Sequence, residues 1–417
     1  MNTDFTSETP IMAEHISRFN KIVVLNVIRQ SKEISRADIV KKTGLSAPTV
    51  TRIVDSLINN EKLVEQVGTG ESSGGRPPVI VRFCSDINYV IGIDLGRTHI
   101  HGIVANLDGE TIFSKDIPLS TEGTFDHDIA LVINLITDLI SNSGVHPTRL
   151  LGIGLAVAGF VNQLTDKVEF SPNFGWNMVN VKAHLKEEFN IPIFVDNVSR
   201  VMAMGELIYG LGQEIDDFVY VNIGYGIGSG IITQGKPYLG YDGFAGEIGH
   251  VKIKSFDLSK SSRKCVCGKT DCLECYVSGR GITETVQMEL ENNPGSLILK
   301  LCSDDKTKIT TKLIASAAGK GDQLAKDVLN NAASILGITL ANVANTINPR
   351  TIIIGGKVAL SGDFFFEKIK EEFQKVSLPN VSRKIKVEKS RLIVDAAVKG
   401  AIALILKEIL ELNVLIK

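Results

Sequence analysis

The chain has 417 residues, more than one hydrophobic core usually supports, so two or three domains are expected. Hydrophobic residues make up 44% of the chain, which is enough material for those cores. No apolar stretch is long enough to span a bilayer, and the first ten residues are polar and acidic. The composition therefore argues against membrane insertion and a secretory signal, and it predicts a cytoplasmic protein.

Charge is distributed unevenly along the chain. The formal net charge is −2, yet residues 16–82 contain 11 Lys or Arg against 6 Asp or Glu. A basic module attached to an acidic body is expected when only that module meets a polyanion. An ordinary solvated surface is the alternative.

The N-terminal segment has the pattern of three helices after a flexible tail, expected at residues 1–14. Apolar residues at helical spacing predict the first helix over residues 16–30. Ser35, with an acidic residue three positions later, predicts the start of a second helix, which Gly44 ends. Ser46 predicts the N-cap of a third, with a proline tolerated in its first turn.

Two short helices joined by a Gly-containing turn are typical of a helix-turn-helix, whose second helix reads the major groove. The side chains expected on its reading turns are Ser46, Pro48, Thr49, Thr51 and Arg52.

Strands expected at residues 63–67 and 79–83 complete a winged helix-turn-helix over residues 15–83. Arg76, between Gly and Pro residues in the wing, predicts an arm that enters the narrow minor groove of A·T-rich DNA. A flexible linker is the alternative.

Strands and helices then alternate, which predicts an α/β body. A β-branched run at residues 89–93 leads into Asp94-Leu95-Gly96-Arg97-Thr98, and a second strand is expected at residues 99–105. Gly-rich segments follow at residues 222–230 and 352–356. Each Gly turn can direct backbone amides at phosphate, but hairpins need the same glycines.

Three cysteines behind a histidine have the spacing of a closed metal site. The four side chains are His250, Cys265, Cys267 and Cys272. Thiolate and imidazole ligands suit zinc, and four protein ligands leave no position for a reactive water, so a structural zinc is predicted. Buried free thiols are the alternative, and Cys275 is a competing ligand with a less fitting spacing.

The segment Glu247-Ile248-Gly249-His250, followed by C-x-C-G-x-x-x-C-x-E ending at Glu274, resembles the ROK family of bacterial sugar kinases and sugar-responsive repressors. Asp271 stands where the family pattern has Gly. The resemblance extends from about Ile16 to the C-terminus and implies a two-lobed actin-like, sugar-kinase (ribonuclease H-like) body. Lobe 1 is expected at residues 84–195, completed by a C-terminal helix at 395–417, and lobe 2 with the zinc site at residues 196–394.

The resemblance also implies a sugar cleft. The residues that match the family's sugar contacts are Gly159, Asn173, Asn197, Glu247, His250 and Glu274. The single Trp, Trp176, is equally well explained as a core residue. The expected effector is a small sugar or a sugar phosphate.

Two positions depart from the family's kinases. Val198 stands where the kinases have the Asp that acts as general base, and Tyr225 replaces a Thr in the second Gly-rich loop. An aliphatic side chain cannot accept a proton. If the strand continued past Asp196, that carboxylate would lie about 7 Å from position 198 and would not substitute for the base. The chain is therefore predicted not to be an enzyme.

Together these features predict a sugar-responsive repressor of carbohydrate uptake or metabolism genes. It is expected to bind a pseudo-palindromic, A·T-rich operator as a homodimer or a dimer of dimers. A DNA-tethered, ATP-dependent sugar kinase is the alternative, and a third possibility is a body that senses a protein of sugar transport.

Overall fold

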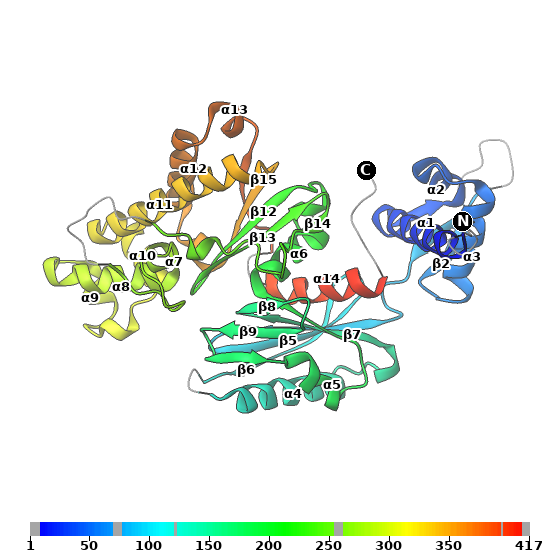
Figure 1. Cartoon of the computed structure of the whole chain (residues 1–417), viewed down its shortest axis with the longest axis horizontal. Helices are drawn as coiled ribbons and strands as arrows, with labels where there is room; N and C mark the ends of the chain where they lie inside the picture. Colours follow the sequence, from blue (N-terminus) through cyan, green and yellow to red (C-terminus); the bar gives the residue numbers. More distant parts are fainter. Residues whose placement is uncertain (1–8, 70–76, 121–122, 254–261, 393–394, 411–417) are drawn as a thin grey trace, which may run out of the picture.

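The computed structural model describes residues 9–69, 77–120, 123–253, 262–392 and 395–410. A small N-terminal unit lies to one side of two lobes, each built on a five-stranded sheet (Figure 1). The predicted fold class, a winged helix followed by a two-lobed sugar-kinase-like body, is confirmed. Arg76 lies outside the described residues.

The N-terminal unit packs three helices on a three-stranded sheet of order β1-β3-β2. Its elements are α1 (Thr9–Ser31), β1 (Glu33–Ser35), α2 (Arg36–Thr43), α3 (Ala47–Asn59), β2 (Val64–Thr69) and β3 (Val79–Phe83). Residues 9–14, expected in a flexible tail, are helical in the structure, since α1 begins at Thr9. Pro10 is compatible with this start because the N–H groups of a first helical turn have no intrahelical partner.

The caps predicted in this unit are present. Ser35 accepts a hydrogen bond from the Asp38 amide, and Gly44 ends α2 in the left-handed conformation with φ 69°. Ser46 accepts from the Thr49 amide and starts α3. Each cap satisfies a backbone donor or ends a helix without a Cβ clash, so both helix starts and one helix end are determined locally.

Lobe 1 is a sheet of order β11-β7-β4-β5-β6, with α4 packed beneath it (Figure 1). Its elements are β4 (Tyr89–Leu95), β5 (His99–Asn106), β6 (Thr111–Pro118), α4 (Phe125–Asn142), β7 (Leu150–Val157), α5 (Val181–Glu188) and β11 (Ile193–Asn197). A small sheet of β8 (Phe160–Asn162), β9 (Lys167–Ser171) and β10 (Trp176–Val179) follows β7. The other face is covered by α14 (Ala396–Leu410), which approaches closely because Gly92 and Gly154 have no Cβ.

Lobe 2 is a sheet of order β14-β13-β12-β15-β16. Its strands are β12 (Phe218–Ile223), β13 (Ile227–Thr233), β14 (Lys236–Pro237), β15 (Thr351–Gly355) and β16 (Lys386–Lys389). Its helices are α7 (Glu274–Val277), α8 (Gly279–Glu289), α9 (Leu297–Leu301), α10 (Thr311–Gly319), α11 (Gln323–Ile347), α12 (Asp363–Val376) and α13 (Pro379–Ser382). One large core joins these helices to the sheet.

Helix α6 (Val198–Tyr209) connects the lobes and packs against α14. The strand before it ends at Asn197, so the strand does not reach position 198, which the estimate of about 7 Å from Asp196 required. The physical reason is the side chain of Asn197, which accepts from the amides of Ser199 and Arg200 and thereby starts a helix.

Candidate functional site

A cavity of about 230 Å³ lies between the two lobes. All six residues predicted as sugar contacts line it, namely Gly159, Asn173, Asn197, Glu247, His250 and Glu274. They come from both lobes and span more than a hundred positions, so only the fold brings them together. Whether they bind a sugar stays a prediction at this point.

Asn197 already has several partners in this cavity. Its Oδ1 accepts from the Ser199 amide at 2.9 Å and the Arg200 amide at 3.3 Å, and its Nδ2 donates to the carbonyl of Gly159 at 2.8 Å. The side chain therefore joins the start of α6 to the loop after β7.

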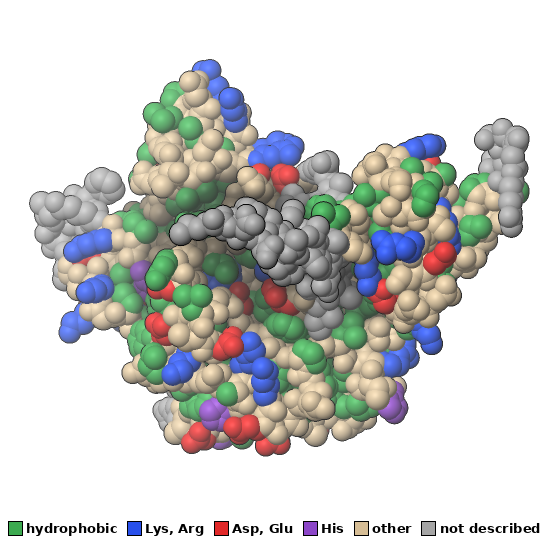
Figure 2. Space-filling view, turned by 45° about the vertical axis from the view of Figure 1, so that its right-hand side comes forward, with side chains coloured by type: hydrophobic (Ala, Val, Ile, Leu, Met, Phe, Trp, Pro, Cys, Tyr) green, Lys and Arg blue, Asp and Glu red, His purple; other side chains and the backbone are tan. Residues whose placement is uncertain are grey.

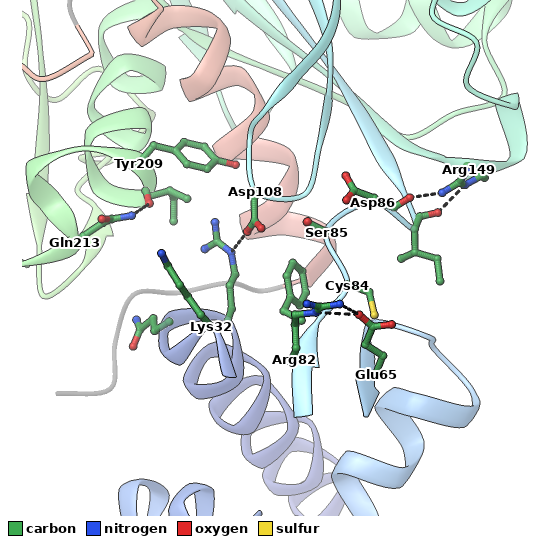
Figure 3. A pocket seen from close by; sticks show the side chains of 15 residues that line it. Lys32, Glu65, Arg82, Cys84, Ser85, Asp86, Asp108, Arg149, Tyr209 and Gln213 are labelled. Carbon is green, nitrogen blue, oxygen red and sulfur yellow. Dashed lines mark hydrogen bonds and ion pairs between the residues drawn. The ribbon is translucent and has the colours of Figure 1, made fainter. Parts of the chain in front are cut away.

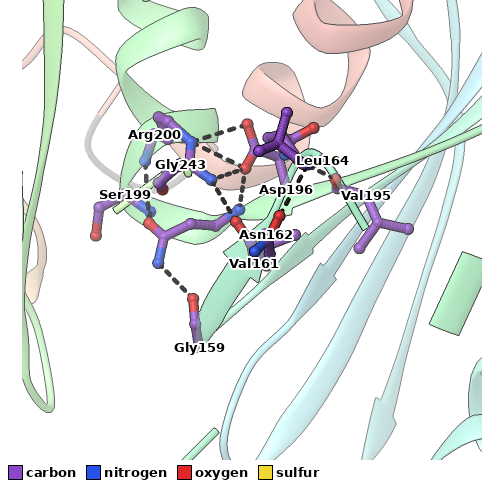
Figure 4. A network of polar contacts seen from close by, with 11 residues as sticks. Gly159, Val161, Asn162, Leu164, Val195, Asp196, Ser199, Arg200 and Gly243 are labelled. Atoms are coloured by element: carbon purple, nitrogen blue, oxygen red, sulfur yellow. Dashed lines mark hydrogen bonds and ion pairs between the residues drawn. The ribbon is translucent and has the colours of Figure 1, made fainter. Parts of the chain in front are cut away.

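Beside Asn197 lies a buried ion pair that the sequence did not reveal (Figure 4). The guanidinium of Arg200 is only 2% exposed; it donates to the Asp196 carboxylate, with Nε at 2.9 and 3.0 Å from its oxygens, and to the carbonyls of Val161 and Gly243. Asp196 is thus neutralised in place. Asp196 and Arg200 are four positions apart, which would suggest an ion pair along one helix. In the structure Asp196 lies near the end of β11 and Arg200 in the first turn of α6.

Two carboxyl groups of the cavity have perturbed acidity. Desolvation raises the pKa of Glu247 to about 7, although Arg200 opposes the shift and Glu274 adds to it. Desolvation also raises the pKa of Asp94 to about 6, against the favourable charges of His99, His101 and Lys357. Carboxyls with raised pKa values in a cleft are typical of a functional site.

The predicted metal ligands form one compact group. Donor atoms of His250, Cys265, Cys267 and Cys272 all lie within 4.8 Å of one another. Cys265 Sγ is 3.7 Å from His250 Nδ1, and Cys267 Sγ is 3.7 Å from Cys272 Sγ. A tetrahedral zinc with bonds of about 2.3 Å to sulfur requires sulfur–sulfur separations of about 3.8 Å, so the group fits this ion. Cys275 is not a member of this group, although it packs against Cys265 and Cys272; its thiol lies 3.7 Å from the carbonyl of Lys264.

The metal group touches the cavity at two points. Cys265 Sγ lies 3.0 Å from Glu274 Oε1, and the ring of His250 stacks on Phe160 with centroids 5.9 Å apart. A metal at this position would hold His250 and the segment before α7 in place at the wall of the cavity.

Arginine side chains that the sequence did not single out also line the cavity. The guanidinium of Arg97, from the turn after β4, lies over the ring of Tyr225 at 3.9 Å from its centroid. Arg280, near the start of α8, is 3.5 Å from Glu274. In the sequence, the position of Arg97 in the first Gly-containing turn could have marked it as a cleft residue. No local pattern indicates that its partner is Tyr225.

Trp176 belongs to the core of lobe 1. The side chain is 2% exposed, and its Nε1 donates to Asp128 at 3.2 Å. Of the two explanations left open by the sequence, the structural one applies.

The predicted DNA-reading side chains lie at the start of α3. Ser46, Pro48, Thr51 and Arg52 are exposed and Thr49 is half-buried, while Val50, Ile53, Val54 and Leu57 are buried on the other side. An ion pair of 2.7 Å between Arg36 and Asp55 fixes α2 against α3. Figure 2 shows Lys and Arg side chains spread over one face of the molecule, with Asp and Glu side chains between them, so no continuous positive field covers this face.

A second cavity, of about 1130 Å³, separates the winged unit from the lobes (Figure 3). Arg29 of α1 reaches across it: its Nε is 3.7 Å from Asp108 Oδ1, and its guanidinium lies 5.8 Å from the ring centroid of Tyr209. Arg29 Nε and Tyr209 Oη are buried without a hydrogen-bond partner among the described residues. This contact joins the end of α6 to the winged unit.

The described helices contain none that is both long and apolar enough to cross a bilayer.

Comparisons with known proteins agree with this architecture. Residues 90–408 match the sequence model of the ROK family. The chain is 32% identical over 395 residues to a xylose repressor of Caldicellulosiruptor bescii, covering 95% of this chain and 97% of that protein.

Two solved structures are similar as well. One is a ROK family transcriptional regulator described as a homologue of the E. coli MLC protein, with a TM-score of 0.82, 27% identity and coverage of 96% of this chain and 99% of that one. The other is a ROK family glucokinase from Streptomyces griseus in complex with glucose and AMPPNP, with a TM-score of 0.68, 27% identity and coverage of 76% and 99%. The regulator thus matches the whole chain and the kinase only the two lobes.

Proposed function

Because the chain belongs to the ROK family and is a sugar-responsive transcriptional regulator, we propose that a monosaccharide bound between its lobes releases its winged helix from operator DNA. The observation that carries this proposal is that one chain has both an exposed, capped helix α3 and a cleft with the aliphatic Val198 at the start of α6. The regulated genes would be those of carbohydrate uptake or metabolism, and the regulator would act in the cytoplasm.

The size of the cleft supports a single sugar ring as effector. Its volume of about 230 Å³ is below the roughly 300–1,000 Å³ of pockets that hold drug-sized ligands. We propose that Gly159, Asn173, Asn197, Glu247, His250 and Glu274 contact this sugar. Carboxylates and amides suit sugar hydroxyls, which both donate and accept hydrogen bonds.

The same cleft argues against phosphoryl transfer. Val198 occupies the first position of α6, and its aliphatic side chain cannot take a proton from a sugar hydroxyl. Asp196, the neighbouring carboxylate, is held in its ion pair with Arg200. A positioned general base is typically worth about 10²–10⁴ in rate, so its loss leaves binding without efficient catalysis.

Helix α6 is the proposed connection between sugar and DNA. It begins at Val198, after its N-cap Asn197 in the lining of the cleft, and ends at Tyr209 beside Arg29 of the winged unit. Its 12 residues span about 18 Å as a rigid element. A sugar that prefers one arrangement of the lobes would move this helix and so change the position of the winged unit.

We further propose that the metal is a structural zinc and that the repressor acts as a homodimer. A pseudo-palindromic operator requires two reading helices related by a two-fold axis. The surface expected at that axis is an apolar groove of about 830 Å³ between β13 and α11, in which Val251 and Ile347 are exposed. Sedimentation should give a dimer, and Ile347→Asp should lower its association constant at least tenfold.

The proposal is tested by DNA selection followed by titration. The full chain should select a pseudo-palindromic site with A·T-rich flanks from random duplexes, and D-xylose, D-glucose or N-acetyl-D-glucosamine should weaken that binding. Arg52→Ala should abolish operator binding and leave calorimetric sugar binding unchanged. ATP-dependent phosphorylation of any of these sugars by the unmodified chain would instead establish the kinase alternative.

A further inference from the structure

The two lobes are in direct contact at one end of the sugar cleft, through one side chain from each. Arg97 follows β4 in lobe 1, and Tyr225 lies in the turn between β12 and β13 of lobe 2. The guanidinium of Arg97 lies 3.9 Å from the centre of the Tyr225 ring, which places it against the ring face. Both residues line the same cavity as the proposed sugar contacts. We call this pair the Arg97–Tyr225 gate.

The gate is built from groups that would otherwise serve a phosphate. A guanidinium offers planar donors that match phosphate oxygens, and Gly-rich turns present backbone amides to anions. Arg97 instead directs its charge at an aromatic face, where the ring quadrupole attracts it. The related glucokinase from Streptomyces griseus was solved with both glucose and AMPPNP, whereas in this chain the cavity of about 230 Å³ has both Arg97 and the ring of Tyr225 in its lining.

The remaining charges of the cavity favour a neutral ligand. Carboxyl groups of Asp94, Glu247 and Glu274 line it, and the second cation, Arg280, lies 3.5 Å from Glu274. A phosphate entering this space would therefore meet carboxyl groups while Arg97 remains against Tyr225.

From this geometry we infer that the Arg97–Tyr225 gate determines the charge of the effector: the cleft accepts an uncharged monosaccharide and rejects its phosphate ester and nucleotide phosphates. Tyr225 excludes them by occupying space and by holding Arg97 away from the ligand. This inference rests on the proposed function, because it assigns the ligand class of the same cleft.

Two substitutions separate the contributions of the pair. Tyr225→Thr removes the ring and frees the guanidinium, so we expect the affinity for Mg·AMPPNP and for D-glucose 6-phosphate to rise at least tenfold over wild type. Arg97→Gly with Tyr225→Thr opens the same space without the cation, so most of that gain should disappear. Arg97→Gly alone leaves the ring in place and should bring no gain. Tyr241→Thr, at a side chain that is 94% exposed, is the matched control.

Calorimetric titration of each zinc-loaded variant with Mg·AMPPNP, D-glucose 6-phosphate and the three neutral sugars measures these affinities, and thermal unfolding confirms that each variant folds. Equal phosphate affinity in wild type and Tyr225→Thr, or a gain that survives in the double variant, would overturn the gate. The titration with Mg·AMPPNP does not depend on which sugar is the effector. If the nucleotide titrations behave as expected while no sugar binds or changes operator affinity, the sugar-sensing proposal fails together with the acceptance of a monosaccharide, and only the exclusion of phosphates by the gate stands.

Discussion

Asn197 and Glu247 illustrate how residues that line the cleft affect the stability of the fold. The amide of Asn197 caps α6 and holds the loop that contains Gly159. The carboxyl group of Glu247 is desolvated, which makes its charge costly in the absence of a ligand. Substitutions at the two positions therefore have opposite expected effects on stability.

Two substitutions of Asn197 should separate its role as the N-cap of α6 from its hydrogen bond to the Gly159 carbonyl of lobe 1. Asn197→Ala removes the cap acceptor and is expected to lower the free energy of unfolding by about 1–2 kcal/mol. Asn197→Asp keeps the acceptor for the Ser199 and Arg200 amides but loses the donor to the Gly159 carbonyl. Urea denaturation should rank the stabilities as wild type, then Asp, then Ala, and equal stability of Ala and wild type would contradict the capping role.

Glu247→Gln should stabilise the protein in a pH-dependent way. The pKa of Glu247 is raised from 4.5 to about 7 in the folded chain, so the folded state binds the proton more tightly than the unfolded state does. The free energy of unfolding therefore falls as pH rises between these values. Above pH 7 the folded state carries the full destabilisation caused by the charged, desolvated carboxylate.

Above pH 7, Glu247→Gln is expected to be more stable than wild type by on the order of 1–3 kcal/mol, and the difference should vanish near pH 4. Urea denaturation at several pH values measures it, with Glu284→Gln at an exposed position of α8 as the control. A difference that is flat with pH would show that the carboxyl group is not desolvated.

At the scale of elements, the segment that carries the predicted metal ligands is held by isolated bridges and by hydrogen bonds that the Asp271 carboxylate accepts from Ser262, the Arg263 amide and Tyr276. The three cysteines lie within eight positions, in a segment of turns and isolated bridges rather than regular strands. The cysteine ligands would lose protons on binding a metal, and the metal would join this segment to His250. Through His250 and Glu274 the segment forms part of the wall of the cleft.

Zinc removal is accordingly expected to affect both stability and sensing. Purified protein should contain about one zinc per chain, and Cys267→Ser should lose it, lower the thermal midpoint and weaken the response to sugar together. Cys302→Ser, a buried cysteine outside the metal group, is the matched control and should retain the zinc. Elemental analysis that finds no zinc in freshly purified, unchelated wild type would contradict the assignment.

At the scale of the whole molecule, the winged unit and lobe 1 share one cluster of buried hydrophobic residues, and a large cavity lies beside it. Arg149 donates from Nε to the carbonyl of Ile87 at 2.7 Å, and the Leu107 amide donates to the carbonyl of Ser85 at 3.0 Å, so the connecting segment follows lobe 1 (Figure 3). The contact between Arg29 and Tyr209 then relates the winged unit to α6.

Tyr209 provides the test of this connection. Tyr209→Ala removes the ring against Arg29 and is expected to leave sugar affinity within about twofold of wild type while reducing sugar-induced operator release at least tenfold. Tyr209→Phe keeps the ring and removes a buried hydroxyl without a described partner, so coupling should persist and stability should not fall. Calorimetry and fluorescence anisotropy on operator DNA measure the two quantities, and normal release in the Ala variant would exclude this route.

The sequence by itself determined the features that depend on neighbours along the chain. The caps at Ser35 and Ser46 and the left-handed Gly44 are local backbone chemistry, and the three cysteines lie within one turn-rich segment. The proposed loss of the general base likewise rests on the identity of one side chain, Val198. The six predicted cleft residues came from a family resemblance, and the structure placed all of them around one cavity.

Only the tertiary structure decided which distant groups meet. It placed Arg97 against Tyr225, Arg29 beside Tyr209, and the carbonyl of Gly243 at the buried Arg200. It also showed that Asp196 is held by an ion pair across the end of a strand. Each of these contacts depends on the packing of separate elements, which the hydrophobic cores set through shape and volume, and no spacing between residues in the sequence records that packing.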